Sequence, residues 1–301
     1  MNEARDIIKP ITSDAPTAQG RPNSASLRVQ LSALLATPVG WLKNAFVFHP
    51  KVRVDTSPEA YGLPYEEVWF GGTDGRLLHG WYVPSLSPSS VDSESPVFLW
   101  FHGNAGNVGH RLAHLRLLRE HVGGSHFMFD YQGFGQSHGK PSIPGILDDG
   151  RAAIAYAHQR GWTANRSVVY LGESLGAAVV ITLALEAPPS HAILLAPFLS
   201  LRAMGEIRLP PLAFLVDQDL NSARLVKRFP APLLVIHGTA DRTIPFQQGQ
   251  ALYDLAPQPK RFYAIQGAAH TNLHEAGGGI YIRVLREFLA TSAVRSDEAK
   301  F

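Results

Sequence analysis

One stretch constrains this chain more than any other, the run SVVYLGESLGAA at residues 167–178. Its first five residues favour a β-strand, and the Ala-, Val- and Leu-rich residues that follow favour a helix. Between the two lies Gly-x-Ser-x-Gly, with Ser174 at its centre. Because the glycines keep side chains out of a tight turn, the pattern predicts a serine hydroxyl exposed between a strand and a helix. The free backbone N–H groups of that helix, which begins at Leu175, would then point at whatever the serine attacks.

Strand-like and helical segments alternate along most of the chain. Two β-rich runs, 65–70 and 77–83, flank the turn sequence Gly-Gly-Thr-Asp-Gly and predict an antiparallel hairpin. A hairpin followed by repeated β-α units predicts an α/β fold with a mostly parallel, doubly wound sheet. The later strands are expected at 96–101, 126–130, 167–171, 191–195, 232–236 and 261–265, and the longer helices at about 142–160, 175–185 and 273–289.

The chain divides into segments around this unit. Residues 1–26 are polar with scattered prolines and predict a disordered leader, and 27–48 form an apolar N-terminal segment. The main domain is expected at 49–292, with a polar tail at 293–301. The connection at about 197–230 is much longer than a βα loop needs, so it predicts a small lid.

The apolar segment contains an uncharged run at 29–42, which is too short to span a bilayer and is interrupted by Pro38 and Gly40. It therefore favours an interfacial or core-packing helix over a transmembrane one. Residues 1–20 lack the apolar core of a secretory signal. We expect a cytoplasmic protein, with peripheral membrane contact through 29–42 as an open alternative.

Composition excludes several function classes. The chain of 301 residues has no cysteine, which excludes disulfides, thiolate metal sites and cysteine nucleophiles. Its net charge is +2 and it contains no long basic run, so nucleic acid is not an expected partner. No metal-ligand spacing and no phosphate-binding Gly-Lys-Ser/Thr loop is visible, so we expect neither a metal nor a cofactor.

Two further strands end in residues that complement Ser174. The strand at 232–236 leads into His-Gly-Thr-Ala-Asp, which ends at Asp241, and the strand at 261–265 leads into Gln-Gly-Ala-Ala-His, which ends at His270. The carboxyl ends of parallel strands meet at one edge of a sheet, where active residues gather. The alternatives are Asp217 and Asp219 for the carboxylate, and His274, one helical turn further on, for the imidazole.

The chemistry requires each of these residue types. A serine hydroxyl is a weak nucleophile near neutral pH, so His270 would accept its proton and later return it to the leaving group. Asp241 would hold the imidazole in the required tautomer and stabilise its charged form. The developing oxyanion needs backbone donors. Leu175 would supply one N–H, and Asn104 in the loop HGNAGN at 102–107 the other, with Ala105 as the alternative.

Other polar residues near strand ends have plainer interpretations. Asp130 is expected to brace its loop by hydrogen bonds, and His102 and His237, each followed by glycine, are expected to be structural turn residues. The lid is rich in apolar residues, which either pack it onto the domain or line an acyl pocket. The candidate pocket residues are Met204, Leu212 and Phe214.

From about His49 to Leu289 the chain resembles an α/β-hydrolase, close to the small, short-lidded serine hydrolases of the α/β-hydrolase-domain group. The matching pieces are 102–107, 130–135, 172–176, 237–241 and 267–270. The resemblance implies the α/β-hydrolase fold and hydrolysis of carboxylic esters, thioesters or lipid acyl groups. Many relatives have an N-terminal membrane helix or a palmitoylated, cysteine-rich N-terminus, whereas this chain has no cysteine and only a short apolar segment.

We therefore expect a serine hydrolase that cleaves a small-molecule or lipid acyl ester or thioester through an acyl-enzyme. Two alternatives remain: a serine peptidase or amidase with the same triad, and a catalytically silent binding protein of the same fold. Dehalogenase or epoxide-hydrolase chemistry on this fold would need an acidic nucleophile, and position 174 is serine.

Overall fold

The computed structural model describes residues 44, 47–86, 95–208 and 220–290. The chain divides into two units, Met1–Leu42 and Lys43–Phe301, and every described residue belongs to the second. The expected leader at 1–26, the uncharged run at 29–42 and the tail at 293–301 lie outside the described residues. The same holds for the middle of the expected lid, 209–219.

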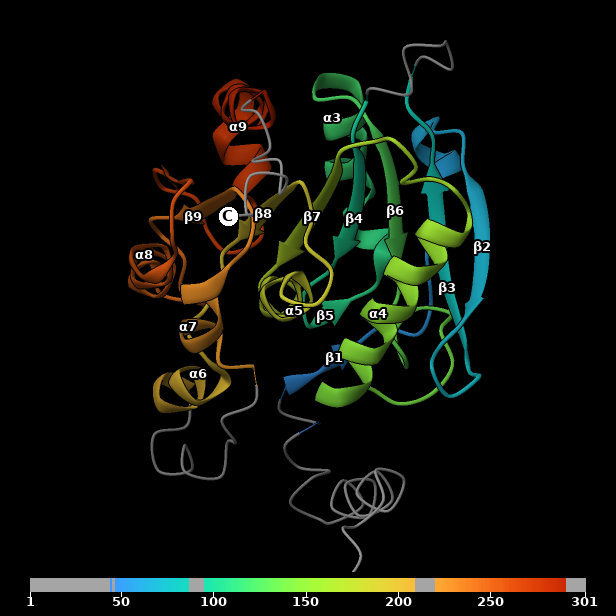
Figure 1. The fold of residues 1–301 in the computed structure, drawn as a ribbon, viewed down its shortest axis with the longest axis horizontal. Coiled ribbons are helices and arrows are strands. Elements are labelled where there is room, and N and C mark those ends of the chain that lie inside the picture. The colour runs from blue at the N-terminus through green and yellow to red at the C-terminus, as the bar shows by residue number, and fades with distance from the viewer. Residues whose placement is uncertain (1–43, 45–46, 87–94, 209–219, 291–301) are drawn as a thin grey trace, which may run out of the picture. The chain divides into compact units, whose positions relative to one another are not determined.

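An eight-stranded sheet runs through the centre of the second unit, in the order β10-β9-β8-β7-β4-β6-β3-β2 (Figure 1). Neighbours from β10 to β6 pair in parallel, whereas β3 pairs antiparallel with both β6 and β2. This confirms a mostly parallel sheet with an antiparallel N-terminal hairpin. The strands are β2 (Glu66–Gly71), β3 (Leu77–Val83), β4 (Val97–Phe101), β6 (Ser125–Phe129), β7 (Val168–Glu173), β8 (His191–Leu195), β9 (Leu233–Gly238) and β10 (Lys260–Ile265).

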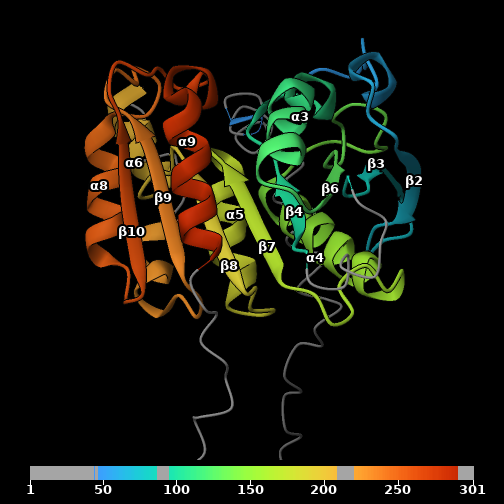
Figure 2. The ribbon, with the colours of Figure 1, turned by 90° about the horizontal axis from the view of Figure 1, so that it is seen from above.

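Helices cover both faces of this sheet (Figures 1 and 2). On one face, apolar residues of α3 (Leu112–His121) and α9 (Leu273–Leu289) join one buried cluster. On the other, α4 (Ile143–Gln159), α5 (Leu175–Ala184) and α8 (Phe246–Leu255) join a second. Every residue of β4, β6, β8 and β9 is buried. Strands covered on both faces require such continuous apolar runs, which is why the sequence located them.

Two of the expected helices differ in detail from the structure. The helix expected from about 142 begins at Ile143, because Ser142 is extended and its Oγ accepts the Gly145 N–H as an N-cap. The helix at 273–289 has its expected bounds but is kinked at Gly278, where φ is 48°. No helix among the described residues is long and apolar enough to cross a membrane.

Several short elements were not expected from the sequence. They include β1 (His49–Pro50), which pairs in parallel with β5 (Ala105–Gly106) in the loop after β4. Neither strand has the length or the apolar run that a sequence pattern needs. The others are η1 (Pro58–Tyr61), η3 (Val108–Arg111), α6 (Leu201–Arg208), α7 (Ser222–Leu225) and η5 (Val226–Arg228).

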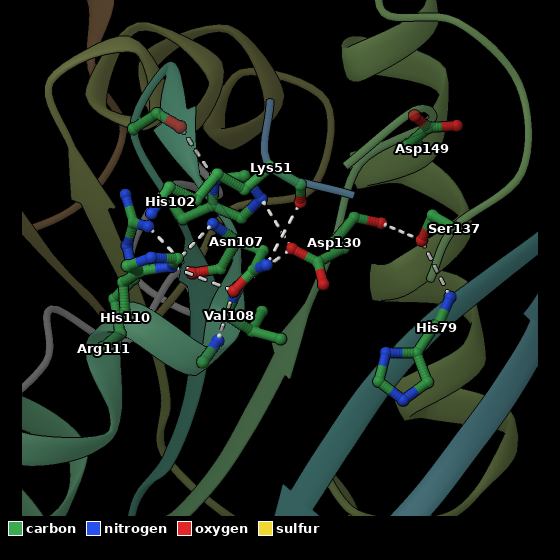
Figure 3. Close-up of polar contacts among 12 residues, drawn as sticks. Lys51, His79, His102, Asn107, Val108, His110, Arg111, Asp130, Ser137 and Asp149 are labelled. Atoms are coloured by element: carbon green, nitrogen blue, oxygen red, sulfur yellow. Dashed lines mark hydrogen bonds and ion pairs between the residues drawn. The ribbon is translucent and has the colours of Figure 1, made fainter. Parts of the chain in front are cut away.

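The loop after β4 is held in place by buried polar side chains (Figure 3). Asn107 Nδ2 donates to the carbonyls of Lys51 and Arg53, at 3.1 and 2.8 Å, and its Oδ1 accepts the Gly109 N–H. Asp130, directly after β6, accepts the Val108 N–H at 2.9 Å. The prediction that Asp130 braces a loop agrees with this contact, although the loop it braces is the one after β4.

Close packing also fixes the turn that contains Ser174. A Cβ built on Gly176 would lie 1.8 Å from the Phe101 carbonyl oxygen, and one on Gly172 would lie 2.6 Å from the Gly176 carbonyl oxygen. The backbones of α5, β7 and β4 therefore approach each other so closely that only glycine fits. Ser174 itself has φ 53° and ψ −110°, a left-handed conformation that costs a non-glycine residue about 1–3 kcal/mol.

We expect Gly176→Ala to lower the free energy of unfolding by about 3 kcal/mol or more, because its methyl group overlaps the backbone of Phe101. The matched control is Gly279→Ala in α9, where a Cβ meets nothing within 4 Å. That change should raise stability by about 0.5–1 kcal/mol. Urea unfolding of both variants measures the difference, and an equal effect of the two would contradict the close approach.

Burial raises the pKa of Asp130 to about 7, although the Val108 N–H and the charge of Arg111 lower it. The folded state therefore retains this proton at pH values where the unfolded chain, with a pKa near 3.8, has lost it. Stability from this group is complete below pH about 4 and is lost as the pH rises through about 7.

Asp130→Asn removes this titration while keeping the oxygen that accepts the Val108 N–H. Between pH 5 and pH 8 the wild type should lose stability relative to the variant, by a few kcal/mol at most. Thermal unfolding across this range measures it. Parallel curves for the two proteins would mean that Asp130 titrates far below pH 5.

Candidate active site

Ser174 stands at the topological switch point of the sheet. It lies between β7 and α5, and β7 is flanked by β4 and β8. The chain leaves β4 toward β6 on one side and returns to β7 on the other, so the loops after β4 and β7 separate there. Ligands of open α/β sheets bind in the crevice that this separation leaves at the carboxyl ends of the strands.

Asp241 and His270 meet at the same edge. Asp241 follows β9 and His270 follows the adjacent parallel strand β10, so the sheet itself brings their loops together. The Nδ1–H of His270 donates to Oδ2 of Asp241 at 2.7 Å. With its proton on Nδ1, the ring has Nε2 free to accept another proton.

The Asp241 carboxylate is buried and surrounded by donors. Its Oδ1 accepts the N–H groups of Thr243 and Ile244, at 2.8 and 2.9 Å. Its Oδ2 also lies 3.3 Å from Nε2 of His237. Burial by itself raises the pKa of Asp241, but the hydrogen bonds from His237, His270 and the Ile244 N–H hold the pKa well below its usual value. Asp241 is therefore an anion throughout the neutral range.

Ser174 and His270 line one cavity of about 410 Å³, together with Lys51, Arg111 and His114. We call it the basic cavity. The hydrogen bonds of the described residues include none between the Ser174 hydroxyl and His270. In free hydrolases this contact is often long and shortens only when substrate binds.

Ser174 also opens onto a second cavity, of about 380 Å³. We call it the apolar cavity, because its lining includes Val47, Phe198, Leu201, Met204 and Ile244. Met204, one of the expected pocket residues, is therefore next to the nucleophile candidate. The other two, Leu212 and Phe214, lie outside the described residues.

The two expected oxyanion donors, Leu175 and Asn104, line the apolar cavity beside Ser174. Leu175 is the first residue of α5, where backbone N–H groups have no partner in the helix. Asn104 donates from its side chain to the Val47 carbonyl at 2.8 Å, and its own carbonyl accepts the His49 N–H at 2.8 Å. These bonds engage the side chain and the carbonyl and leave the Asn104 N–H without a described partner. The alternative donor, Ala105, lines the basic cavity.

The other candidates are placed differently. His274 stacks on His114, with ring centroids 4.5 Å apart, and burial lowers its pKa to about 4. The histidine that contacts Asp241 from β10 is His270, so the geometry favours it as the base. Asp217 and Asp219 lie outside the described residues.

His237 has more than the turn role expected for it. Its Nε2–H donates to the Ile244 carbonyl at 2.9 Å and faces Asp241. His102 is the first residue of the loop after β4, and its Nδ1 contacts the Gly103 carbonyl at 2.7 Å. Burial lowers the pKa of His102 to about 3, so its ring is neutral.

One group of site residues was not recognised from the sequence. Glu173, directly before Ser174, lies 3.3 Å from Nε of Arg111 and 3.6 Å from Nδ1 of His114. Burial raises the pKa of Glu173, but the His114 hydrogen bond and the Arg111 charge outweigh it and lower the pKa to about 2. The one available signal was the acidic residue inside Gly-x-Ser-x-Gly, because Arg111 and His114 are distant in the chain.

Within the described ranges, no three histidine or acidic side chains are grouped so that they could hold a metal ion.

Comparisons with known proteins agree with the architecture. The family model Hydrolase_4, described as serine aminopeptidase, S33, matches residues 93–223. The uncharacterized protein YfhR of Escherichia coli K12 is 32% identical over 252 residues, which cover 82% of this chain and 87% of YfhR. The α/β hydrolase domain-containing protein WAV2 of Arabidopsis thaliana is 30% identical over 254 residues, or 77% of this chain and 81% of WAV2.

Solved structures give the same fold. The esterase Pf2001 of Pyrococcus furiosus superposes with a TM-score of 0.66 at 18% identity, over 82% of this chain and all of that one. An α/β serine hydrolase homologue from Coxiella burnetii has a TM-score of 0.57 at 18% identity, over 75% of this chain. With this shared fold, and with WAV2 matching most of both chains, the chain belongs to the α/β-hydrolase superfamily.

Proposed function

We propose that this protein is a serine hydrolase that cleaves carboxylic esters or thioesters, with Ser174 as nucleophile, His270 as general base and Asp241 as its orienting carboxylate. The observation that carries the proposal is the 2.7 Å hydrogen bond from His270 to the buried, charged Asp241. Because this bond is made by Nδ1–H, Nε2 is the ring atom that can accept a proton, and His270 lines the same cavity as Ser174. The esterase Pf2001 and the family match to hydrolases support the same reaction class.

The reaction then follows from the roles of these groups. Ser174 Oγ attacks the acyl carbon while His270 Nε2 takes its proton, and Asp241 stabilises the imidazolium. The backbone N–H groups of Leu175 and Asn104 stabilise the oxyanion. Collapse of the intermediate expels the alcohol or thiol, which receives the proton from His270. Water, activated by the same imidazole, hydrolyses the acyl-enzyme and regenerates Ser174.

The lining of the two cavities supports an acyl substrate over a peptide. An apolar acyl chain matches the apolar cavity, where each buried methylene contributes about 0.8 kcal/mol. The matching family model carries the description serine aminopeptidase, so a serine peptidase or amidase is the alternative to compare. A free peptide N-terminus needs a carboxylate partner, and the one acid that the described lining of either cavity offers is Glu173. Glu173 is already paired with Arg111 and His114.

The alternative of a catalytically silent binding protein is less well supported. The left-handed backbone of Ser174 costs free energy, and such strain is concentrated at functional sites. The proposed substrate remains a small-molecule or lipid acyl ester. Peripheral membrane contact through 29–42 and the cytoplasmic location are still predictions from the sequence.

Ser174 should react covalently with a fluorophosphonate probe, because this reagent labels a serine that a neighbouring base activates. Ser174→Ala should abolish labelling and lower kcat for p-nitrophenyl esters by a factor on the order of 10⁶. Gel fluorescence and steady-state kinetics measure the two effects. Stoichiometric labelling of the alanine variant would place the nucleophile elsewhere.

The two neighbouring histidines should separate clearly. His270→Ala should lose nearly all turnover, because it removes the proton acceptor that Asp241 orients. His274→Ala is the matched control, since that ring stacks on His114 and makes no contact with Asp241. It should keep most of its kcat with p-nitrophenyl esters. The reverse ranking would transfer the base to His274 and refute the proposed triad.

A further inference from the structure

The two cavities that meet at Ser174 differ in polarity and in the number of charged side chains that line them. Of the residues that line the apolar cavity, Arg208 is the charged one, and its Nη2 donates to the Thr243 carbonyl at 2.9 Å. The basic cavity contains Lys51 and Arg111 against a single acid, Glu173. A substrate bound across Ser174 therefore meets a mostly apolar lining with one cation on one side, and two cations with one acid on the other.

The proton transfer from His270 indicates which cavity holds the acyl chain of the substrate and which holds the leaving group. His270 must deliver its proton to the departing oxygen or sulfur, so the leaving group lies on the His270 side of Ser174. His270 lines the basic cavity, whereas Leu175, an oxyanion donor candidate, lines the apolar one. The acyl chain accordingly occupies the apolar cavity and the leaving group occupies the basic cavity.

Arg111 has one donor available on this side. Its Nε faces Glu173 and its Nη1 donates to the Asn107 carbonyl at 2.8 Å, while Nη2 has no hydrogen-bond partner among the described residues. A methyl group placed on Gly103 would lie 3.6 Å from Arg111 Nη2 and 3.6 Å from Ser174 Cβ. Arg111 Nη2 and Ser174 Cβ are therefore no more than 7.2 Å apart.

Lys51 supplies the second cation. It is exposed, lines the basic cavity and forms no ion pair with a described acid. Glu173 is paired with Arg111 and His114, and Asp55, the acid nearby in the chain, is paired with Arg53 at 2.8 Å. Burial and the charge of Arg111 lower the pKa of His110, and burial lowers that of His274, so near neutral pH neither ring adds to the positive charge of the cavity. The cavity presents an excess of positive charge to its ligand.

Resting on the hydrolase function proposed above, we infer that the leaving group of the substrate is an anionic alcohol or thiol, which Lys51 and Arg111 recognise in the basic cavity. The anion lies a few bonds from the scissile carbonyl, because Arg111 Nη2 is no more than 7.2 Å from Ser174 Cβ. Lys51 then determines specificity without taking part in the chemical step.

Three thioesters with the same butanoyl group test this inference. Their thiols are 2-mercaptoethanesulfonate, 2-mercaptoethanol and thiocholine, which are anionic, neutral and cationic. Each kcat/KM is divided by the rate of the same thioester with hydroxide, which corrects for intrinsic reactivity. We expect the anionic thioester to exceed the cationic one by about tenfold at low salt, and high salt should reduce the difference.

Variants at Lys51 should change this ratio. Lys51→Gln should reduce the preference for the anionic over the cationic thioester several-fold, and Lys51→Glu should abolish or invert it. Lys227→Glu is the matched control, because it makes the same charge change at an exposed residue of η5 that lines neither cavity. It should leave the ratio unchanged.

Two kinds of failure are distinguishable. Turnover that depends on Ser174 but is equal for the three thiols, or fastest for thiocholine, overturns the anionic leaving group and leaves the hydrolase function intact. An equal response to Lys51→Glu and Lys227→Glu overturns the role of Lys51. If the protein cleaves none of the three thioesters and no p-nitrophenyl ester, the proposed function is wrong, and so is this inference.

Discussion

The structure depends on the near-contact between the backbones of α5 and β4. Gly176 approaches the Phe101 carbonyl so closely that a Cβ would lie 1.8 Å from it, and this contact forces the sharp turn at Ser174. Apolar residues of β4, β7 and α5 pack around the turn in one buried cluster, and this packing offsets the strain. The same contact brings the loop after β4 beside Ser174, so nucleophile candidate and oxyanion loop are positioned together.

Charge compensation organises the remainder of the site. Two carboxylates, Asp241 and Glu173, lie at the carboxyl ends of the strands. Their negative charges are compensated in different ways. Asp241 is bound by backbone N–H groups and by two imidazoles, which keeps it charged and available to orient His270. Glu173 is bound by Arg111 and His114 and therefore offers no free charge to a ligand. The site can accordingly be basic toward substrate although it contains two acids.

The sequence predicted those parts of the molecule that local patterns encode. Continuous apolar runs located the buried strands, and the strand-turn-helix pattern located Ser174, since both depend on neighbours in the chain. Asp241 and His270 were candidates because each lies in the loop that follows a strand, and the structure places them within hydrogen-bond distance of each other. The ion pairs of Glu173 join residues far apart in sequence, and the two-residue strand β1 has no pattern of its own, so neither could be predicted. The Gly278 kink was also missed, because a glycine inside a helical pattern does not by itself disclose its φ.

The central claim is that the reaction passes through an ester on Ser174, and trapping that intermediate tests it most directly. The protein would be mixed with excess p-nitrophenyl acetate, quenched in acid during turnover and digested for mass spectrometry. We expect that the peptide containing Ser174, and no other, gains the mass of one acetyl group. Its accumulation should match a burst of p-nitrophenol. Acetylation of a different residue would contradict this mechanism. So would steady turnover with an unmodified Ser174 peptide and no burst, under low-pH conditions that slow deacylation.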